Sequence, residues 1–302
     1  MPRVWRQCMN DRPVWLRVRA PSEAEAEGMR AVRDVLDAER LHTICQGAQC
    51  PNVVECWSAR TATFLLLGEI CTRACRFCAV RHAARGEEFD PSEPDRVAAA
   101  VQRLGLRYAV LTSVDRDDLP DGGSVAVAET VTAIKRRSPE TRVEVLLPDF
   151  GGDPRALSHV LSSGADVLGH NLETVRRISP ALRDARASYE RSLDVLAYLR
   201  LGSEGRPVKS GLMLGLGEEL GEIREAMDDL LRAGVTSLTL GQYLAPSRRA
   251  APIRRYVHPD EFDALAGEAR AAGFLSVASG PLVRSSYHAE AALTDPCDSS
   301  ST

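Results

Sequence analysis

The sequence has 302 residues, of which 44% are hydrophobic and 26% charged, and its formal net charge is −4. This ordinary globular balance excludes a disordered chain and a fibrous repeat, and the length suits about two domains or one large α/β barrel. No apolar run approaches the ~20 residues of a membrane helix, and the net charge gives no basic field for nucleic acid. We therefore expect a cytoplasmic protein with neither a membrane nor a nucleic acid as its partner.

The pattern of apolar residues predicts helices and strands in alternation. Ser22 and Glu25 form a capping box that begins a first helix. Seven apolar runs follow, at 63–68, 108–114, 142–148, 165–171, 208–217, 237–242 and 274–280. Helical patterns separate most of them, at 93–104, 123–138, 188–202, 220–234 and 258–272. Nearly all-apolar strands that alternate with helices indicate a parallel sheet covered on both faces.

The predicted fold class is therefore α/β, as a partial (β/α) barrel of the TIM type, with a doubly wound open sheet as the alternative. We expect an N-terminal extension at residues 1–60, the barrel at 61–280, and a C-terminal closing segment with a disordered tail at 281–302. Polar and glycine-rich segments follow every predicted strand. Because barrels carry their chemistry on the loops after the strands, we expect the functional site there.

Three cysteines with the spacing C-x3-C-x2-C follow the first predicted strand of the barrel, at Cys71, Cys75 and Cys78. Three thiolates leave one iron of a [4Fe–4S] cube without a protein ligand, whereas electron-transfer clusters normally take four. The spacing therefore suggests a cluster whose fourth iron binds a substrate or cosubstrate. The alternative is a zinc site completed by His82, although zinc sites usually use paired C-x2-C units.

This motif resembles the signature of the radical S-adenosylmethionine (SAM) superfamily, with Phe77 as the aromatic residue before the last cysteine. The resemblance implies that the open iron chelates the amino and carboxylate groups of SAM. It also implies that the reduced cluster cleaves SAM to a 5′-deoxyadenosyl radical, which abstracts hydrogen from an unactivated carbon. The protein would supply positioning and exclude side reactions.

A second group of cysteines lies upstream, at Cys45, Cys50 and Cys56, with the spacing C-x4-C-x5-C. Free cysteines are often small buried hydrophobes, but three within twelve residues favour a second iron–sulfur cluster. That cluster needs a fourth ligand. The remaining cysteines, Cys8 and Cys297, lie near the chain ends and are expected to be bystanders. A residue other than cysteine is therefore a candidate for the fourth ligand.

The two cysteine motifs together with further blocks resemble the lipoyl synthase family from about residue 15 to residue 289. The blocks include PNVVECW, CTRACRFCAV, SVDRDDLPDGG, HNLETV, KSGLMLGLGE and SGPLVRSSYHA. In that family a serine of the RSSY motif ligates the auxiliary [4Fe–4S] cluster, which is the sulfur source and is consumed. Ser286 is the matching candidate and Ser285 the second choice, although the residues alone would favour an ordinary turn.

The resemblance implies sulfur insertion at C6 and C8 of a protein-bound octanoyl-lysine group. The cofactors would be SAM and two [4Fe–4S] clusters. The partners would be an octanoylated carrier, such as a lipoyl domain of a 2-oxoacid dehydrogenase or the glycine cleavage H protein, and an electron donor such as ferredoxin or flavodoxin. The alternatives are another sulfur-inserting radical SAM enzyme, biotin synthase-like or a methylthiotransferase, and a zinc-binding module.

The candidate contacts to SAM are polar, aromatic or small residues near the ends of the predicted strands. They are Phe77, Ser113, Glu173, Arg186, Gly215 and Glu218, with Arg191 as an alternative to Arg186 for the methionine carboxylate and the acidic loop Asp115, Asp117 and Asp118 beside Ser113. Small residues such as Gly211 and Gly215 let a nucleoside approach the backbone. Lys209, one of only two lysines, and Asn171 are further candidates. For each charged residue the alternative is a solvated loop or a helix cap.

Overall fold

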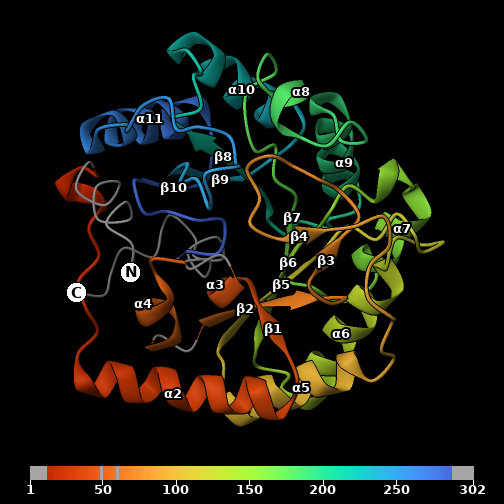
Figure 1. The fold of residues 1–302 in the computed structure, drawn as a ribbon. Helices are drawn as coiled ribbons and strands as arrows, with labels where there is room; N and C mark the ends of the chain where they lie inside the picture. Colours follow the sequence, from red (N-terminus) through yellow and green to blue (C-terminus); the bar gives the residue numbers. More distant parts are fainter. Residues whose placement is uncertain (1–11, 48–49, 59–60, 288–302) are drawn as a thin grey trace.

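The computed structural model describes residues 12–47, 50–58 and 61–287 (Figure 1). Cys8, Cys297 and residues 288–302, which include the predicted disordered tail, lie outside the described residues. The strands are β1 (His42–Thr43), β2 (Thr61–Leu66), β3 (Ile70–Cys71), β4 (Arg81–His82), β5 (Tyr108–Ser113), β6 (Arg142–Leu146), β7 (Val167–Gly169), β8 (Val208–Leu214), β9 (Ser237–Gln242) and β10 (Ser276–Gly280). The α-helices are α2 (Glu23–Ala38), α3 (Ile44–Gly47), α4 (Val53–Ser58), α5 (Glu93–Leu104), α6 (Ser124–Arg137), α7 (Pro154–Leu161), α8 (Ser179–Leu182), α9 (Tyr189–Leu201), α10 (Leu220–Arg232) and α11 (Pro259–Ala272). Two short 3-10 turns are η1 (Val14–Leu16) and η2 (Phe150–Gly152).

Eight strands form one sheet in the order β1-β2-β5-β6-β7-β8-β9-β10, and all neighbours are parallel except β1 with β2. The seven parallel strands are therefore adjacent in their chain order. A doubly wound sheet reverses that order at a switch point, so this alternative was wrong. The edge strands of the sheet are β1 and β10, and the prediction of a partial rather than closed barrel is confirmed (Figure 1).

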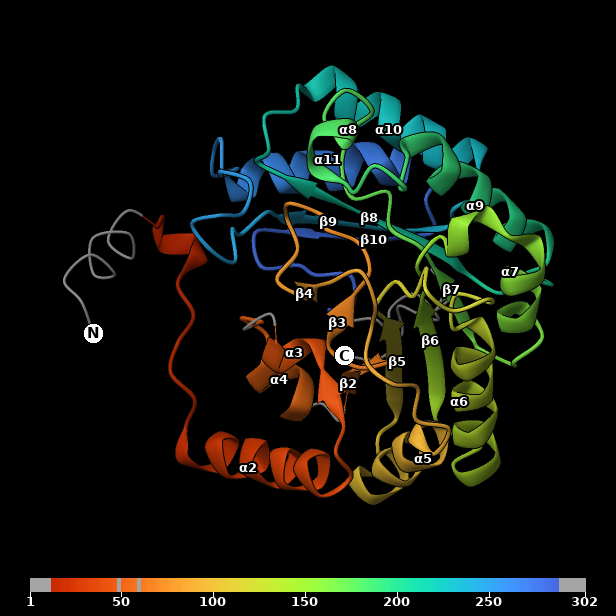
Figure 2. The ribbon, with the colours of Figure 1, turned by 45° about the vertical axis from the view of Figure 1, so that its right-hand side comes forward.

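The helices cover the outside of the sheet, and Figure 2 shows α5, α6, α7, α9, α10 and α11 following its curve. Strand residues on the outer face, such as Phe64, Leu111 and Val145, belong to one apolar core with helix residues such as Val97 and Ile134. The burial of these side chains is the main source of stability, at roughly 25 cal/mol for each Å² of apolar surface removed from water. None of the described helices is long and apolar enough to cross a membrane.

The inner face of the sheet carries many small or polar side chains. Residues paired across parallel strands share a face, so the register places the following residues inside: Thr63, Val110, Glu144, Val167, Gly169, Lys209, Gly211, Thr239, Gly241, Ala278 and Gly280. Glycine and alanine at several of these positions leave room inside the open barrel. A chain segment or a ligand can therefore enter from the ends of the strands.

The N-terminal residues pack against the same core as the barrel. The predicted capping box is confirmed, because Ser22 Oγ accepts from Glu25 N at 3.3 Å and the Glu25 carboxylate accepts from Ser22 N at 2.8 Å. Helix α2 buries Val32 and Leu36 against α4 and α5. Figures 1 and 2 show α3 and α4 in the opening between β1 and β10, beside the C-terminal segment drawn in dark blue.

Candidate functional site

The three thiols of the C-x3-C-x2-C motif lie on the loop that follows β2. Each sulfur accepts a backbone N–H: Arg73 donates to Cys71 at 3.4 Å, Asp184 to Cys75 at 3.4 Å, and Val80 to Cys78 at 3.5 Å. Such N–H···S contacts stabilise thiolates that bind an iron–sulfur cluster. The loop therefore fits the thiolate donor set that the spacing predicts.

Burial raises the pKa of Cys71 to about 12 and that of Cys75 to about 11. Without metal these thiols carry protons, which iron must displace. Among the described residues, no three His, Cys, Asp or Glu side chains converge closely enough to hold a single ion. A [4Fe–4S] cluster does not need such convergence, because each of its thiolates binds a different iron.

Arg73 anchors this loop to the ends of two neighbouring strands. Its side chain is only 3% exposed and pairs with Asp115 at 3.2 Å, Asp117 at 2.8 Å and Asp149 at 2.7 Å. The Thr72 hydroxyl also donates to Asp117, at 2.8 Å. Two carboxylates from the loop after β5 and one from the end of β6 thus hold the cysteine loop in place.

The segment before α9 also holds the cysteine loop in place. Arg186 pairs with Asp184 at 2.9 Å and with Asp117 at 3.1 Å, and it donates to Thr72 O at 2.5 Å. Arg191 donates to the Arg186 carbonyl. Both arginines that the sequence suggested for the SAM carboxylate are thus engaged with the protein here. Their contact with SAM stays a prediction.

Glu173 follows β7 and faces the cysteine loop. It adopts a positive φ of 72°, and its charge acts on Cys75 and Cys78. Burial raises its pKa, against the opposing effects of Arg183 and of a hydrogen bond from the Asn171 amide. The predicted residue Glu173 therefore lies beside the thiols, with a cation nearby.

That cation, Arg183, was missed by the sequence analysis. Its Nη1 donates to Ser188 O at 3.2 Å and to Ser192 Oγ at 2.7 Å, and its charge acts on both Glu173 and Cys75. A carboxylate and a guanidinium beside the thiols complement the ammonium and carboxylate of an amino acid. Arg183 follows the HNLET segment as Arg186 and Arg191 do, and nothing in the sequence distinguishes it from them.

His170 holds Arg183 through a short chain of hydrogen bonds. Its Nδ1 is 2.8 Å from Leu147 O, and because a carbonyl only accepts, Nδ1 carries the proton. Nε2 therefore accepts from the Ser192 hydroxyl at 2.9 Å, which leaves the Ser192 oxygen to accept from Arg183. Burial, followed by the charge of Arg183, lowers the pKa of His170 to about 4. The imidazole is therefore neutral near pH 7.

The remaining predicted contacts to SAM lie at or near the strand ends. The Glu218 carboxylate accepts from the backbone N–H of Gly215 at 2.6 Å and of Leu216 at 2.8 Å, so it closes the turn after β8. The Ser113 hydroxyl is buried and has no hydrogen-bond partner in the described part of the chain. An unsatisfied buried hydroxyl at the end of β5 suits a polar ligand. Phe77 packs against the apolar core.

Lys209 lies in a buried ion pair near the start of β8. Its Nζ is 3.0 Å from both carboxylate oxygens of Glu144, and the Tyr108 hydroxyl donates to the same carboxylate at 2.9 Å. These residues stand near the beginnings of β8, β6 and β5, whereas barrel chemistry occurs at the opposite ends. In this structure Lys209 joins strands inside the barrel.

In the second group of thiols, Cys45 lies on α3, Cys56 on α4, and Cys50 between the two helices. Cys45 is buried, and its carbonyl accepts from the Cys50 N–H at 3.0 Å. Burial and the neighbouring thiols raise the pKa of Cys56 to about 12. All six described cysteines are free. Three free thiols that act electrostatically on one another fit a second donor set.

The C-terminal segment, residues 282–287, is tied to these thiols although it is distant in sequence. Asn52 Nδ2 donates to Leu282 O at 2.7 Å, and the Tyr287 hydroxyl donates to Glu55 at 3.1 Å. The segment thus lies against the loop and helix that carry Cys50 and Cys56. The predicted proximity of the RSSY motif to the upstream cysteines follows from these contacts.

The two serines of this segment differ in their surroundings. Ser285 Oγ accepts from Asn171 Nδ2 at 2.8 Å. No residue that the structure describes makes a hydrogen bond with the Ser286 hydroxyl. Which of the two serines binds iron stays a prediction, with Ser286 as the first choice.

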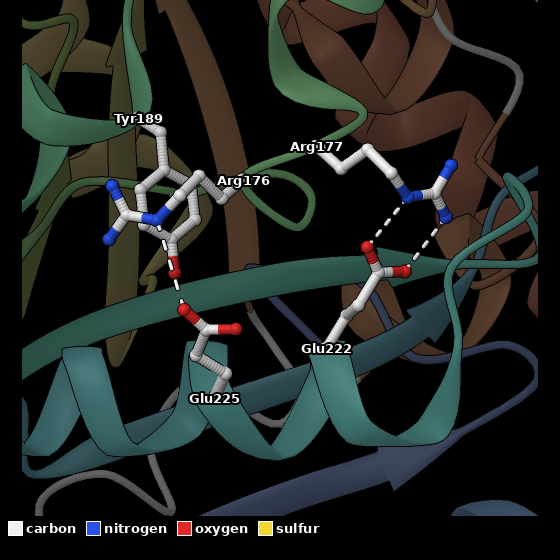
Figure 3. A pocket seen from close by; sticks show the side chains of 5 residues that line it. All are labelled: Arg176, Arg177, Tyr189, Glu222 and Glu225. Carbon is white, nitrogen blue, oxygen red and sulfur yellow. Dashed lines mark hydrogen bonds and ion pairs between the residues drawn. The ribbon is translucent and has the colours of Figure 1, made fainter.

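A separate surface pocket lies between α10 and the start of α9 (Figure 3). Arg177 pairs with Glu222 at 2.7 Å, and the Arg176 guanidinium lies 4.4 Å from the centre of the Tyr189 ring. Glu225 completes the lining. Its charged groups are paired with each other and it contains no thiol, so we assign it no part in the chemistry.

The comparisons with known proteins agree with this geometry. Residues 65–230 match the radical SAM superfamily. A protein of Halorhodospira halophila called lipoyl synthase is 52% identical over 93% of this chain and 84% of its own length. Those of Deinococcus radiodurans and Thermus thermophilus, also called lipoyl synthase, are 52% and 50% identical over 94% and 93% of this chain, and over 85% and 86% of their own lengths.

The chain belongs to the lipoyl synthase family. It is therefore a radical SAM sulfurtransferase, and it uses SAM and [4Fe–4S] clusters. Two solved structures share the fold at low identity. Methylornithine synthase has a TM-score of 0.53 at 13% identity and covers 85% of this chain and 72% of its own. The [FeFe]-hydrogenase maturase HydG has a TM-score of 0.55 at 11% identity, with the same two coverages.

Proposed function

We propose that this lipoyl synthase inserts sulfur at C6 and C8 of an octanoyl-lysine group on a carrier protein. The observation that carries the proposal is the placement of residues 282–287 against Cys50 and Cys56, with the Ser286 hydroxyl left unpartnered among the described residues. Lipoyl synthases act on octanoylated proteins. The carrier is a lipoyl domain of a 2-oxoacid dehydrogenase or the glycine cleavage H protein, and the electron donor is a ferredoxin or flavodoxin.

Each group of thiols has its own task in this proposal. Cys71, Cys75 and Cys78 hold the cluster that, when reduced, cleaves SAM. Cys45, Cys50, Cys56 and Ser286 hold the sulfur-donating cluster, which is a substrate because it is consumed. Oxygen is a harder donor than thiolate and suits iron–sulfur binding less well. A serine ligand is therefore the bond that yields most readily when a bridging sulfide leaves.

The chain itself orients SAM. Glu173 accepts from the SAM ammonium, Arg183 binds its carboxylate, and the unpartnered Ser113 hydroxyl offers a further polar contact. His170 and Ser192 position Arg183 and make no contact with SAM. Arg73 and Arg186 hold the cysteine loop. The proposal also includes domain boundaries at residues 60 and 280 and a cytoplasmic location for the protein.

Product analysis tests the function directly. Anaerobically reconstituted enzyme, SAM, a strong reductant and an octanoyl-lysine peptide should give the lipoyl peptide and two 5′-deoxyadenosines for each lipoyl group. Mass spectrometry quantifies the lipoyl peptide and 5′-deoxyadenosine. A decanoyl-lysine peptide is the control for the length of the acyl chain. Cleavage of SAM with no sulfur in the octanoyl peptide would contradict the proposal and favour another radical SAM reaction.

A binding measurement separates the candidate arginines. We expect Arg183→Ala to weaken SAM binding by ~10–100-fold, because a charge-assisted contact contributes ~1.5–3 kcal/mol. Arg186→Ala should change the affinity less, since its guanidinium is engaged by Asp184 and Asp117. The perturbation of the reduced cluster's EPR spectrum by SAM gives the dissociation constant. A larger loss of SAM affinity in Arg186→Ala than in Arg183→Ala would show that Arg186 binds the SAM carboxylate.

A further inference from the structure

Asn171 lies where the two halves of the site meet. Its Nδ2 donates to Ser285 Oγ at 2.8 Å, and its amide lies near enough to the Glu173 carboxylate to lower the pKa of that group. The charge of Glu173 acts on Cys75 and Cys78, whereas Ser285 adjoins the proposed ligand Ser286. One side chain thus holds the segment beside the second thiols and lies near a residue that acts on the first.

The inner face of the barrel is shaped to admit this contact. A Cβ at Gly211 would lie 2.5 Å from Thr239 Oγ1, 3.1 Å from Asn171 Oδ1 and 3.5 Å from Ser285 Oγ. A Cβ at Gly241 would lie 2.2 Å from Val283 O. Two glycines on neighbouring inner strands therefore let the C-terminal segment and Asn171 approach closely.

The segment has tethers on both sides of Ser286. Leu282 is held by Asn52 and Tyr287 by Glu55, both from the part of the chain that carries the upstream thiols. Asn171 is the side chain from the barrel that holds the segment through a serine. It makes this contact one residue before Ser286.

We propose that Asn171 is a positioning residue, which holds Ser285 and thereby presents Ser286 to the auxiliary cluster. This inference rests on the proposed function, in which Ser286 is a ligand of that cluster. It assigns the two serines different tasks: Ser286 binds iron, and Ser285 accepts the hydrogen bond that orients it. Asn171 follows β7, so the position of Ser286 depends on a residue from the barrel half of the site.

Iron binding tests the proposal without measuring activity. In the full chain, alanine at Cys71, Cys75 and Cys78 leaves only the auxiliary cluster, which should contain about four irons. Because three thiolates alone can hold four irons, each sample is first oxidised mildly. Asn171→Ala and Ser285→Ala should then lose iron toward about three per chain and give the EPR signal of a three-iron cluster, whereas the parent should keep about four. Ser286→Ala should do the same. The double variant of Asn171 and Ser285 should lose no more iron than the more affected single variant, because both substitutions remove the same hydrogen bond.

Ser279→Ala is the matched control, since it removes another half-buried serine hydrogen bond, to Phe262 O at 2.8 Å, outside this contact. It should keep about four irons. A merely structural role for Asn171 would lower the melting temperature without loss of iron. Four irons in both Asn171→Ala and Ser285→Ala would therefore overturn the proposal. Loss of iron in Ser285→Ala but not in Ser286→Ala would make Ser285 the ligand and would also overturn it, whereas lipoyl formation by the wild type tests the function independently.

Discussion

Replacing Cys45 by alanine should leave the cleavage of SAM intact and abolish sulfur insertion. Replacing Cys75 should abolish both. Removing a residue that only hydrogen-bonds a metal ligand already costs ~10–100-fold in metal affinity or activity. Removing a ligand itself should therefore lower the rate of the step that needs that cluster by more than ~100-fold. The measurement is 5′-deoxyadenosine and lipoyl peptide from the same anaerobic reaction, quantified by mass spectrometry.

The control for this pair comes from the cysteines outside the described residues. Cys8→Ala and Cys297→Ala remove a thiol from the same chain and should leave both products unchanged, since these cysteines are expected to be bystanders. Lipoyl formation by the Cys45 variant at the wild-type level would contradict the assignment of the upstream thiols. Cleavage of SAM by the Cys75 variant would contradict the assignment of the downstream ones.

Arg73→Leu should destabilise the protein by ~3–5 kcal/mol, because it leaves buried carboxylates without their cation. The Asp149 side chain has no exposed surface and depends on this pairing most, while Asp115 and Asp117 are partly exposed. The loop that carries the three downstream thiols should loosen at the same time. Urea unfolding of the anaerobically reconstituted enzyme and its iron content give the two effects.

Two further variants separate the charge from the side chain's bulk. Arg73→Leu combined with Asp149→Leu removes both members of the closest pair and should recover part of the loss. Arg76→Leu changes an exposed arginine of the same loop and should cost little. Among the described residues, its side chain makes one hydrogen bond, to Ala181 O at 3.3 Å. Equal destabilisation by Arg76→Leu would show that the buried carboxylates are not the cause.

Periodicity predicted the regular elements well because their signals are local. The helix predicted at 93–104 is α5 with the same bounds, and the one at 188–202 is α9 within one residue at each end. All seven predicted strands are present. Strand β7 is shorter than the predicted 165–171. After Gly169 the chain still follows β8, through His170 N to Lys209 O and an isolated bridge between Glu173 and Leu212, but without a regular strand, and φ is positive at Glu173.

The elements that were not predicted are short or depend on distant contacts. Helix α7 has eight residues, and its Asp153 cap, which accepts from Arg155 N at 2.9 Å, and Pro154 at its first turn were available signals. Strand β1 has two residues and exists because it pairs with β2, which sequence patterns cannot show.

The cysteine groups could be predicted because their spacing is itself the signal. The roles of the charged residues could not, since they depend on which side chains the fold brings together. Arg186 and Arg183 are three residues apart, yet one is paired with aspartates and the other faces Glu173. Lys209 was singled out by its rarity, and it lies in an ion pair with Glu144.

The contacts from Asn52 to Leu282 and from Tyr287 to Glu55 join positions 230 and 232 residues apart. During synthesis the cysteines at 45, 50 and 56 leave the ribosome well before the residues that contact this part of the chain, which follow 230 residues or more later. The upstream thiols of a nascent chain therefore stay uncovered until residues 282–287 have been made. A shortened product that lacks residues 282–287 would keep the downstream loop and lose the means to donate sulfur.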